Sequence, residues 1–182
     1  MHRLLNRLLH RLLIRPATLA SVAAAYVWNE KPTKLAVMKA VVQRCRAAAV
    51  RVEGEVVGQI DFGLTVFVAA LEGDNDANAV KLAHKIAGLR IFSNEDGKFD
   101  LSVLDVGGSV LVVSNFTLAG ETKKGNRPSF ANAARPEVAA GLVETFAKLL
   151  SAQNVPVATG RFGAAMTVTV DNDGPVTILL DT

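Results

Sequence analysis

Cysteine, histidine and the larger aromatic residues are scarce in this chain of 182 residues. It contains one cysteine, three histidines, one tryptophan and one tyrosine. A single cysteine, Cys45, excludes an intramolecular disulfide, and its position in the apolar run VVQRC predicts a small buried residue rather than a nucleophile. After residue 37 the only histidine is His84, so no cluster of Cys, His and carboxylate residues has the spacing of metal ligands. The sequence therefore predicts no metal site and no conventional catalytic triad.

Several short motifs are also missing. The chain has no GxxxxGK[ST] phosphate loop, no GxGxxG after a strand and no GxSxG nucleophile elbow. Asp96 and Asp100 lie near a predicted turn, where we expect solvated side chains, and His84 is expected on a helix surface. These absences exclude a P-loop or dinucleotide-binding protein and a serine hydrolase with a nucleophile elbow.

The net charge of +3 is unevenly distributed along the chain. Residues 1–37 carry six Lys/Arg and one acidic residue, which leaves 14 basic and 16 acidic residues in 38–182. The basic pI therefore comes from the N-terminal segment and does not indicate that the rest of the chain binds nucleic acid. If residues 38–182 bind RNA, they must use a local basic patch.

The N-terminal segment, residues 1–37, has the pattern of a basic amphipathic helix, with arginines at 3, 7, 11 and 15 and leucine pairs between them. The apolar stretch at 17–28 is too short to span a bilayer. We interpret residues 1–37 as an extension outside a fold that begins at Met38, with a misplaced start codon as one origin. Organelle targeting and a membrane-surface role are the alternatives. For residues 38–182 we expect one domain, no membrane contact and a cytoplasmic location.

From Met38 onward the pattern predicts strands, then a helix, strands, a second helix and strands. The first helix is expected after N-caps at Asp74–Asp76, and the second after Arg135, with Pro136 at its first position. This order has no regular βαβ alternation, so it favours a layered α/β fold with much antiparallel sheet and helices on one face. The runs expected to be strands are MKAVVQRC, AAVRVE, EVVGQI, LTVFVAAL, LSVLDV, SVLVVSNF, VATGRF, MTVTVDN and VTILLD.

Two short polar segments interrupt this apolar pattern. Ser114-Asn115-Phe116-Thr117-Leu118 follows a very apolar run, and by itself indicates a strand end capped by polar side chains. Asn172-Asp173-Gly174-Pro175-Val176-Thr177 separates two strand-like runs, and by itself indicates a hairpin turn. A third segment, Lys124-Gly125-Asn126-Arg127-Pro128-Ser129-Phe130, lies between them.

Together these three segments are similar to the signatures of the D-aminoacyl-tRNA deacylase family. SNFTL followed by KGNRPSF resembles the family pattern SQFTL…KGxRPSF, and NDGPVT resembles NxGPVT. The opening MKAVVQRCRAAAVRVEGEVVGQI, the turn RIFSNEDGK and the run TGRFGAAM also look like the family. The resemblance covers residues 38–182 and leaves the extension outside.

The resemblance implies a homodimer of three-layer α/β/β subunits, with two main helices on one side, and no cofactor. It implies a cis bond at Gly174-Pro175, whose backbone carbonyls reach into the partner's pocket and exclude an L-amino acid. It also implies that the SNFTL segment holds the amino acid and the terminal adenosine of an aminoacylated transfer RNA. The pocket residues carried over in this way are Ser114, Asn115, Phe116 and Thr117, with Phe162, Gly163 and Met166 as wall residues.

The expected reaction is hydrolysis of the ester in D-aminoacyl-tRNA, and in glycyl-tRNA as well. Such an ester is already activated, so its cleavage needs a positioned water and stabilisation of an oxyanion, which backbone N–H groups at 114–117 can supply. The substrate's 2′-hydroxyl assists in the family. We expect Thr117 to assist the reaction and not to act as a covalent nucleophile, because the sequence indicates no general base that could activate its hydroxyl.

Three points stay open from the sequence. Asn115 replaces the usual glutamine and is one methylene shorter, which matters only if that side chain contacts substrate. Lys123, Lys124 and Arg127 are placed to meet phosphates, although a solvated loop is the alternative. Finally, a hydrolase of another ester on the same scaffold, or a non-catalytic RNA-binding module, competes with the deacylase interpretation.

Overall fold

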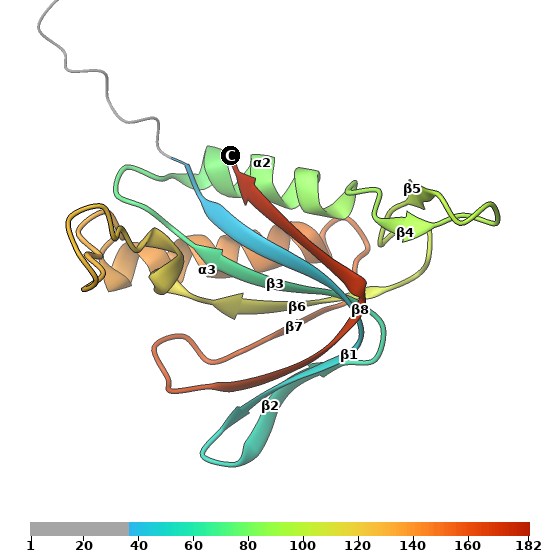
Figure 1. Ribbon diagram of the computed structural model, residues 1–182, viewed down its shortest axis with the longest axis horizontal. Coiled ribbons are helices and arrows are strands. Elements are labelled where there is room, and N and C mark those ends of the chain that lie inside the picture. Colours follow the sequence, from blue (N-terminus) through green and yellow to red (C-terminus); the bar gives the residue numbers. More distant parts are fainter. Residues whose placement is uncertain (1–36) are drawn as a thin grey trace, which may run out of the picture. The chain divides into compact units, whose positions relative to one another are not determined.

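The computed structural model describes residues 37–182, so the N-terminal extension expected at 1–37 lies outside the described residues except for Val37. The described chain contains two α-helices, one short 3-10 helix and eight strands (Figure 1). The strands are β1 (Lys39–Val52), β2 (Glu55–Ile60), β3 (Gly63–Ala69), β4 (Phe92–Ser93), β5 (Phe99–Leu101), β6 (Ser109–Ser114), β7 (Val157–Thr159) and β8 (Thr167–Asp181). The helices are α2 (Asp76–Ala87), the 3-10 helix η2 (Phe116–Ala119) and α3 (Pro136–Ser151).

One six-stranded sheet contains all the long strands. Its order is β2-β1-β3-β6-β7, and β8 pairs with β1. The pairs β1–β2, β1–β3 and β1–β8 are antiparallel, whereas β3–β6 and β6–β7 are parallel. The sheet bends back on itself at one end, where a Cβ on Gly58 of β2 would collide with the backbone carbonyl of Thr159 in β7. Only glycine permits this approach of two backbones.

The sheet is buried on both faces, so residues 37–182 form three layers. Along β6, Val110 and Val112 belong to the core under the helices, while Leu111 and Val113 belong to a second core on the opposite face. Both α2 and α3 cover the first face (Figure 1). The second core lies under the curled part made by β2, the first half of β8 and the second half of β1. This is the expected α/β/β arrangement with two main helices on one side.

Both helices begin where the sequence predicted. Asn75 caps α2, its side chain accepting from the N–H of Ala77, and Asn78 completes a capping box. Pro136 is the first residue of α3, after Arg135. The buried stripe of α3 is centred on Leu142, Phe146 and Leu150.

The strand boundaries differ from the prediction in several places. MKAVVQRC and AAVRVE form one strand, β1, because no turn residue separates them. The register of its pairing with β8 shifts near Cys45, and both halves of β1 stay paired with β8. MTVTVDN and VTILLD likewise form one strand, β8, so no hairpin exists at 172–177. SVLVVSNF ends as a strand at Ser114, where η2 follows. LSVLDV contributes only Leu101 to β5, because the Asp105 carboxylate accepts from the Ser102 N–H and hydroxyl and forms a turn.

Candidate active site

A pocket opens where β3 and β6 end. Its volume is about 550 Å³, and apolar side chains dominate its wall. Six of the sequence-predicted residues line it, namely Ser114, Asn115, Phe116, Phe162, Gly163 and Met166. The structure thus brings together two segments that lie far apart in the sequence. None of the residues that line the pocket is Asp, Glu, His, Cys, Lys or Arg.

The floor of the pocket is fixed by a side-chain cap at the end of β6. Asn115 is the N-cap of η2, and its Oδ1 accepts from the Thr117 N–H at 3.3 Å and from the Thr117 hydroxyl at 2.5 Å. The Asn115 side chain is therefore committed to the turn, which is a role for which asparagine is well suited. Thr117 itself is exposed and does not line the pocket.

The backbone N–H groups of this segment differ in availability. The N–H of Asn115 donates to the Val68 carbonyl at 2.8 Å, and that of Thr117 donates to the Asn115 side chain. The N–H of Phe116, at the start of η2, has no acceptor among the described residues. First-turn N–H groups of a helix lack internal partners, so the unpaired N–H belongs to a residue that lines the pocket.

The opposite wall comes from the turn between β7 and β8. Gly160 allows Met166 to pack inward, because a Cβ at that position would lie 2.7 Å from the Met166 sulfur. Phe162 is 42% exposed, so much of its ring remains open beside the pocket. Further wall residues come from the start of α3 and from the residues before it, and no pattern in the sequence indicated them: Ala133, Ala134, Pro136, Ala139 and Val143.

Gly174 and Pro175 lie away from this pocket, in a bulge of β8. Asn172 pairs with Cys45 and Thr177 with Gln43, and the residues between them stand out of the ladder. The Gly174-Pro175 peptide bond is cis, and Gly174 has a φ of 126°. A Cβ on Gly174 would lie 2.8 Å from Val176 Cγ2 and 2.9 Å from Arg44 Nη2, so the segment has no room for a side chain.

The bulge and the pocket occupy opposite ends of β3. Cys45 pairs with Gly63 beside the bulge, whereas Lys39 pairs with Ala69 beside the pocket. Six residues of strand span roughly 20 Å. Within one chain, Gly174 therefore does not reach the pocket of its own subunit.

Arg44 holds the bulge in place, a role that no pattern in the sequence indicated. Its Nε contacts both the Asp173 carboxylate and the Asp173 carbonyl at 3.2 Å, and its Nη1 donates to the Ile91 carbonyl at 2.7 Å. The guanidinium also lies 5.3 Å from the centre of the Phe99 ring. Arg44 is only 9% exposed, and arginine is seldom buried to this extent unless its guanidinium is paired.

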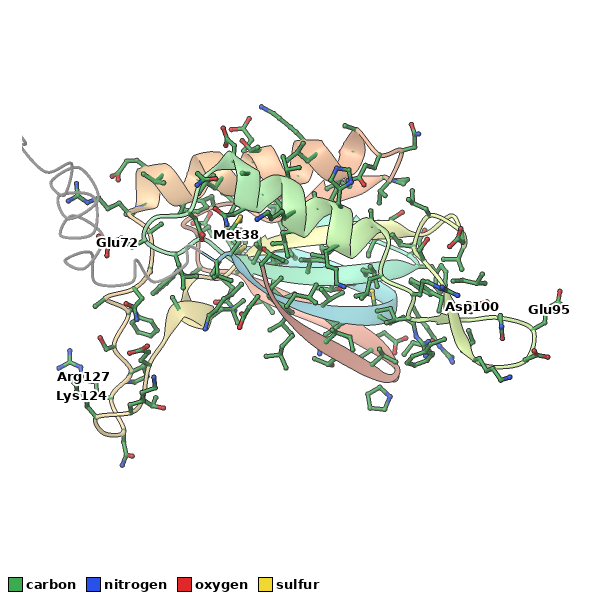
Figure 2. The ribbon with its side chains drawn as sticks, turned by 90° about the horizontal axis from the view of Figure 1, so that it is seen from above. Met38, Glu72, Glu95, Asp100, Lys124 and Arg127 are labelled. Carbon is green, nitrogen blue, oxygen red and sulfur yellow. The ribbon has the colours of Figure 1, made fainter. Side chains whose placement is uncertain are left out.

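The three predicted phosphate-binding residues lie together but outside the pocket. Lys123, Lys124 and Arg127 are all exposed on the loop that follows η2. Figure 2 shows Lys124 and Arg127 next to each other on a loop that projects from the body of the molecule, far from Glu95 and Asp100. Backbone hydrogen bonds in both directions between Glu121 and Ser129 close the base of this loop.

Cys45 is fully buried, as the sequence predicted. Burial raises the pKa of its thiol above the ordinary value, and hydrogen bonds with Thr65 oppose that shift more weakly. His84 is exposed on α2.

Within residues 37–182, no group of three or more Cys, His, Asp and Glu residues is arranged to hold a metal ion. No helix in this described part is long and apolar enough to cross a bilayer.

The fold and the pocket define a three-layer α/β/β protein with a site at strand ends that lacks titratable side chains. The sequence model of the D-Tyr-tRNA(Tyr) deacylase family matches residues 41–181, and the chain belongs to this family. It is 58% identical over 144 residues to a D-aminoacyl-tRNA deacylase of Chloroflexus aurantiacus, covering 79% of this chain and 90% of that one. It is 56% identical to a D-aminoacyl-tRNA deacylase of Ruegeria pomeroyi, covering 79% and 99%.

Two solved structures share the fold. One, titled c-Myc DNA Unwinding Element Binding Protein, has a TM-score of 0.75 and 39% identity, and the match covers 79% of this chain and 98% of that one. The other, titled as a probable eukaryotic D-amino acid tRNA deacylase, has a TM-score of 0.70 at 16% identity, covering 80% and 100%. The resemblance noted in the sequence is therefore confirmed at the level of family and fold.

Proposed function

We propose that this chain hydrolyses the ester bond of D-aminoacyl-tRNA, as a chiral proofreading enzyme of translation. Its family consists of ester hydrolases, and relatives that are more than 50% identical carry the name D-aminoacyl-tRNA deacylase. The observation that carries the proposal is the convergence of the SNFTL segment and the GRFGAAM turn on one pocket. The pocket's volume of about 550 Å³ lies in the range of small-molecule sites, which suits a nucleoside with an aminoacyl group.

The chemistry relies on backbone groups and on the substrate. The pocket wall has no titratable side chain, so no residue there acts as general base or metal ligand. In the proposed reaction a water attacks the ester carbonyl, and the free N–H of Phe116 stabilises the developing oxyanion. The tetrahedral intermediate then collapses, its bond to the 3′-oxygen of the transfer RNA breaks, and the 2′-hydroxyl relays the water's proton to that oxygen, which gives free amino acid and transfer RNA. The Thr117 hydroxyl donates a hydrogen bond to Asn115 Oδ1, so Thr117 supports the turn and is not a nucleophile.

Chiral selection is assigned to Gly174 and Pro175 of a second copy of the chain. The bulge is exposed and lies at the end of the sheet opposite its own pocket. It reaches a pocket only if two subunits pair so that each bulge meets the other's Ser114–Thr117 segment. Its backbone carbonyls then occupy the space that an L-substituent needs, so selectivity arises by exclusion. Glycine has no side chain to exclude, so glycyl-tRNA is a second expected substrate.

The loop with Lys123, Lys124 and Arg127 is assigned to the transfer RNA backbone. Its cations are exposed, and it lies directly after η2, which borders the pocket. Because the remaining chain from residue 38 onward has a net negative charge, this local patch supplies the positive potential that phosphates require. We place the activity in the cytoplasm, and organelle targeting by residues 1–37 is the alternative.

Deacylation of D-Tyr-tRNA, L-Tyr-tRNA and Gly-tRNA by the purified full chain, with and without EDTA, tests this function. We expect rapid hydrolysis of the D- and glycyl esters, slow hydrolysis of the L-ester, and the same rates in EDTA. Equal rates on D- and L-esters would indicate a general esterase on this scaffold. Binding of transfer RNA without hydrolysis would indicate an RNA-binding module, and activity that EDTA abolishes and zinc restores would refute the metal-free mechanism.

A further inference from the structure

Phe130 is an exposed aromatic residue next to the pocket to which neither the sequence motifs nor the proposed reaction gives a role. It does not line the pocket, yet its ring centre lies 5.2 Å from that of Phe116, which does. The two rings are 37% and 60% exposed. Exposed aromatic rings that contact each other form continuous apolar surface, and surface of this kind is a common part of binding sites.

The position of Phe130 is fixed by its surroundings. Its ring meets Phe116 at an interplanar angle of 69°, and a Cβ on Gly120 would lie 3.0 Å from Phe130 Cε1. On one side, the Glu121–Ser129 backbone pair closes the loop immediately before it. On the other, the Ala133 N–H donates to the Phe130 carbonyl at 3.0 Å. An edge-to-face pair uses the edge of one ring and one face of the other, so ring face remains available.

The charge around this ring indicates which partner it faces. Phe130 ends the same loop that carries Lys123, Lys124 and Arg127, and Figure 2 shows Lys124 and Arg127 projecting from it. Aromatic rings combined with a cationic path are typical of surfaces that bind single-stranded nucleic acid. The 3′ end of a transfer RNA is a single strand whose bases are unpaired and free to stack.

We propose that Phe130 stacks against the base of the nucleotide that precedes the terminal adenosine of the transfer RNA. This inference rests on the proposed function, in which the adenosine occupies the pocket. Stacked bases in one strand lie about 3.4 Å apart, so a ring next to Phe116 is within reach of the next nucleotide. The cations of the loop then follow the phosphates farther along the strand.

Two D-tyrosylated minihelices test this proposal. One has the normal 3′ end, and the other has an abasic residue in place of the nucleotide before the terminal adenosine. Loss of one base–aromatic stack is expected to lower kcat/KM about 5- to 150-fold. For the wild-type chain, the abasic substrate shows this loss. The Phe130→Ala variant hydrolyses the normal substrate with the same reduction in kcat/KM, which arises mainly from a higher KM. For this variant, replacing the base by an abasic residue causes no further reduction.

Further variants separate stacking from a structural role. Phe130→Leu keeps apolar contact with Phe116 and Gly120 but has no ring, so it behaves as Phe130→Ala, whereas Phe130→Trp retains the effect of the base. Leu104→Ala, an exposed apolar residue elsewhere, leaves the ratio between the two substrates unchanged. Equal losses on both substrates for Phe130→Ala, or no loss on either, overturn the proposal. Hydrolysis of the normal substrate by the wild-type chain tests the proposed function separately.

Discussion

Arg44 and Asp173 are joined twice, because Arg44 Nε contacts both the side-chain carboxylate and the backbone carbonyl of Asp173 at 3.2 Å. The same guanidinium donates to the carbonyl of Ile91 at 2.7 Å. One side chain of β1 therefore connects the bulge of β8 with the segment that leads into β4. The residue after Asp173 is Gly174, so the orientation of the Gly174-Pro175 segment proposed for chiral selection depends on Arg44.

Arg44→Lys is expected to reduce the discrimination between D- and L-aminoacyl-tRNA. Lysine keeps the charge but lacks the planar fork that reaches Asp173 and Ile91 together. Loss of one hydrogen bond to a charged group costs about 1.5–3 kcal/mol of unfolding free energy. Denaturant unfolding measures this loss, and deacylation assays give the D/L ratio of kcat/KM.

Arg46→Lys is the matched control for this prediction. Arg46 Nε contacts the other oxygen of Asp173 at 2.9 Å, but its side chain is 73% exposed. An exposed ion pair contributes about 0–1 kcal/mol, so stability and the D/L ratio stay close to wild type. If the two variants lose selectivity equally, Arg44 has no special part in orienting the bulge.

Asn115→Ala is expected to lower stability by about 0.5–2 kcal/mol, the range for loss of a helix N-cap. The variant loses the acceptor of the Thr117 N–H and hydroxyl, so kcat should fall as η2 loosens beside the pocket. Asn115→Asp keeps an acceptor at the same position and should retain most of the stability. An Asn115→Ala enzyme with wild-type unfolding and wild-type kcat would contradict the role given to this cap.

Replacing both Lys124 and Arg127 by alanine should weaken the dependence of kcat/KM on salt. Each phosphate contact with a single strand contributes about 0.7 to the slope of log K against log salt. The double variant should therefore lose about 1.4 of that slope, mostly through KM. Lys85→Ala, an exposed lysine on α2, is the control and should keep the slope. Parallel salt curves for all three proteins would exclude contact between the loop and RNA.

The Cys45 thiol should resist alkylation in the folded protein. Burial raises its pKa, which lowers the thiolate fraction at any given pH, and full burial blocks the reagent. Iodoacetamide at pH 8 should label it only after denaturation, at a rate that follows global unfolding. Rapid labelling of the native protein would show that the second core opens locally.

Local patterns in the sequence were sufficient for the starts of the helices, whereas the candidate site residues came from the resemblance to the family. Asn75 and Pro136 mark helix starts through their own chemistry, and the structure agrees at both. The two breaks that the sequence suggested within β1 and β8 are absent, because long strands tolerate a bulge when the partner strand continues. At Asn172–Thr177, proline and glycine indicated a turn, yet pairing with β1 on both sides keeps the strand direction.

The remaining parts of the site depend on contacts between distant segments. Arg44 looks like any charged residue in a strand, and its importance appears only once β8 and the residue Ile91 are packed around it. Ala139 and Val143 line the pocket because α3 begins there, which no local pattern reveals. Thr117 was expected in the pocket, but its hydroxyl faces Asn115, since the polar strand end forms a turn.

The claim that each pocket is completed by the other subunit is tested most directly by complementation between two defective variants. Ala164→Trp fills the pocket of its own chain, and Gly174→Val forces a side chain against Val176 and Arg44. Each homodimer should show lost activity or lost D-selectivity. Refolding the two together creates a mixed dimer with one intact site, so D-selective deacylation should reappear. If the mixture shows no more selective activity than the separate variants, the pocket is not shared between subunits.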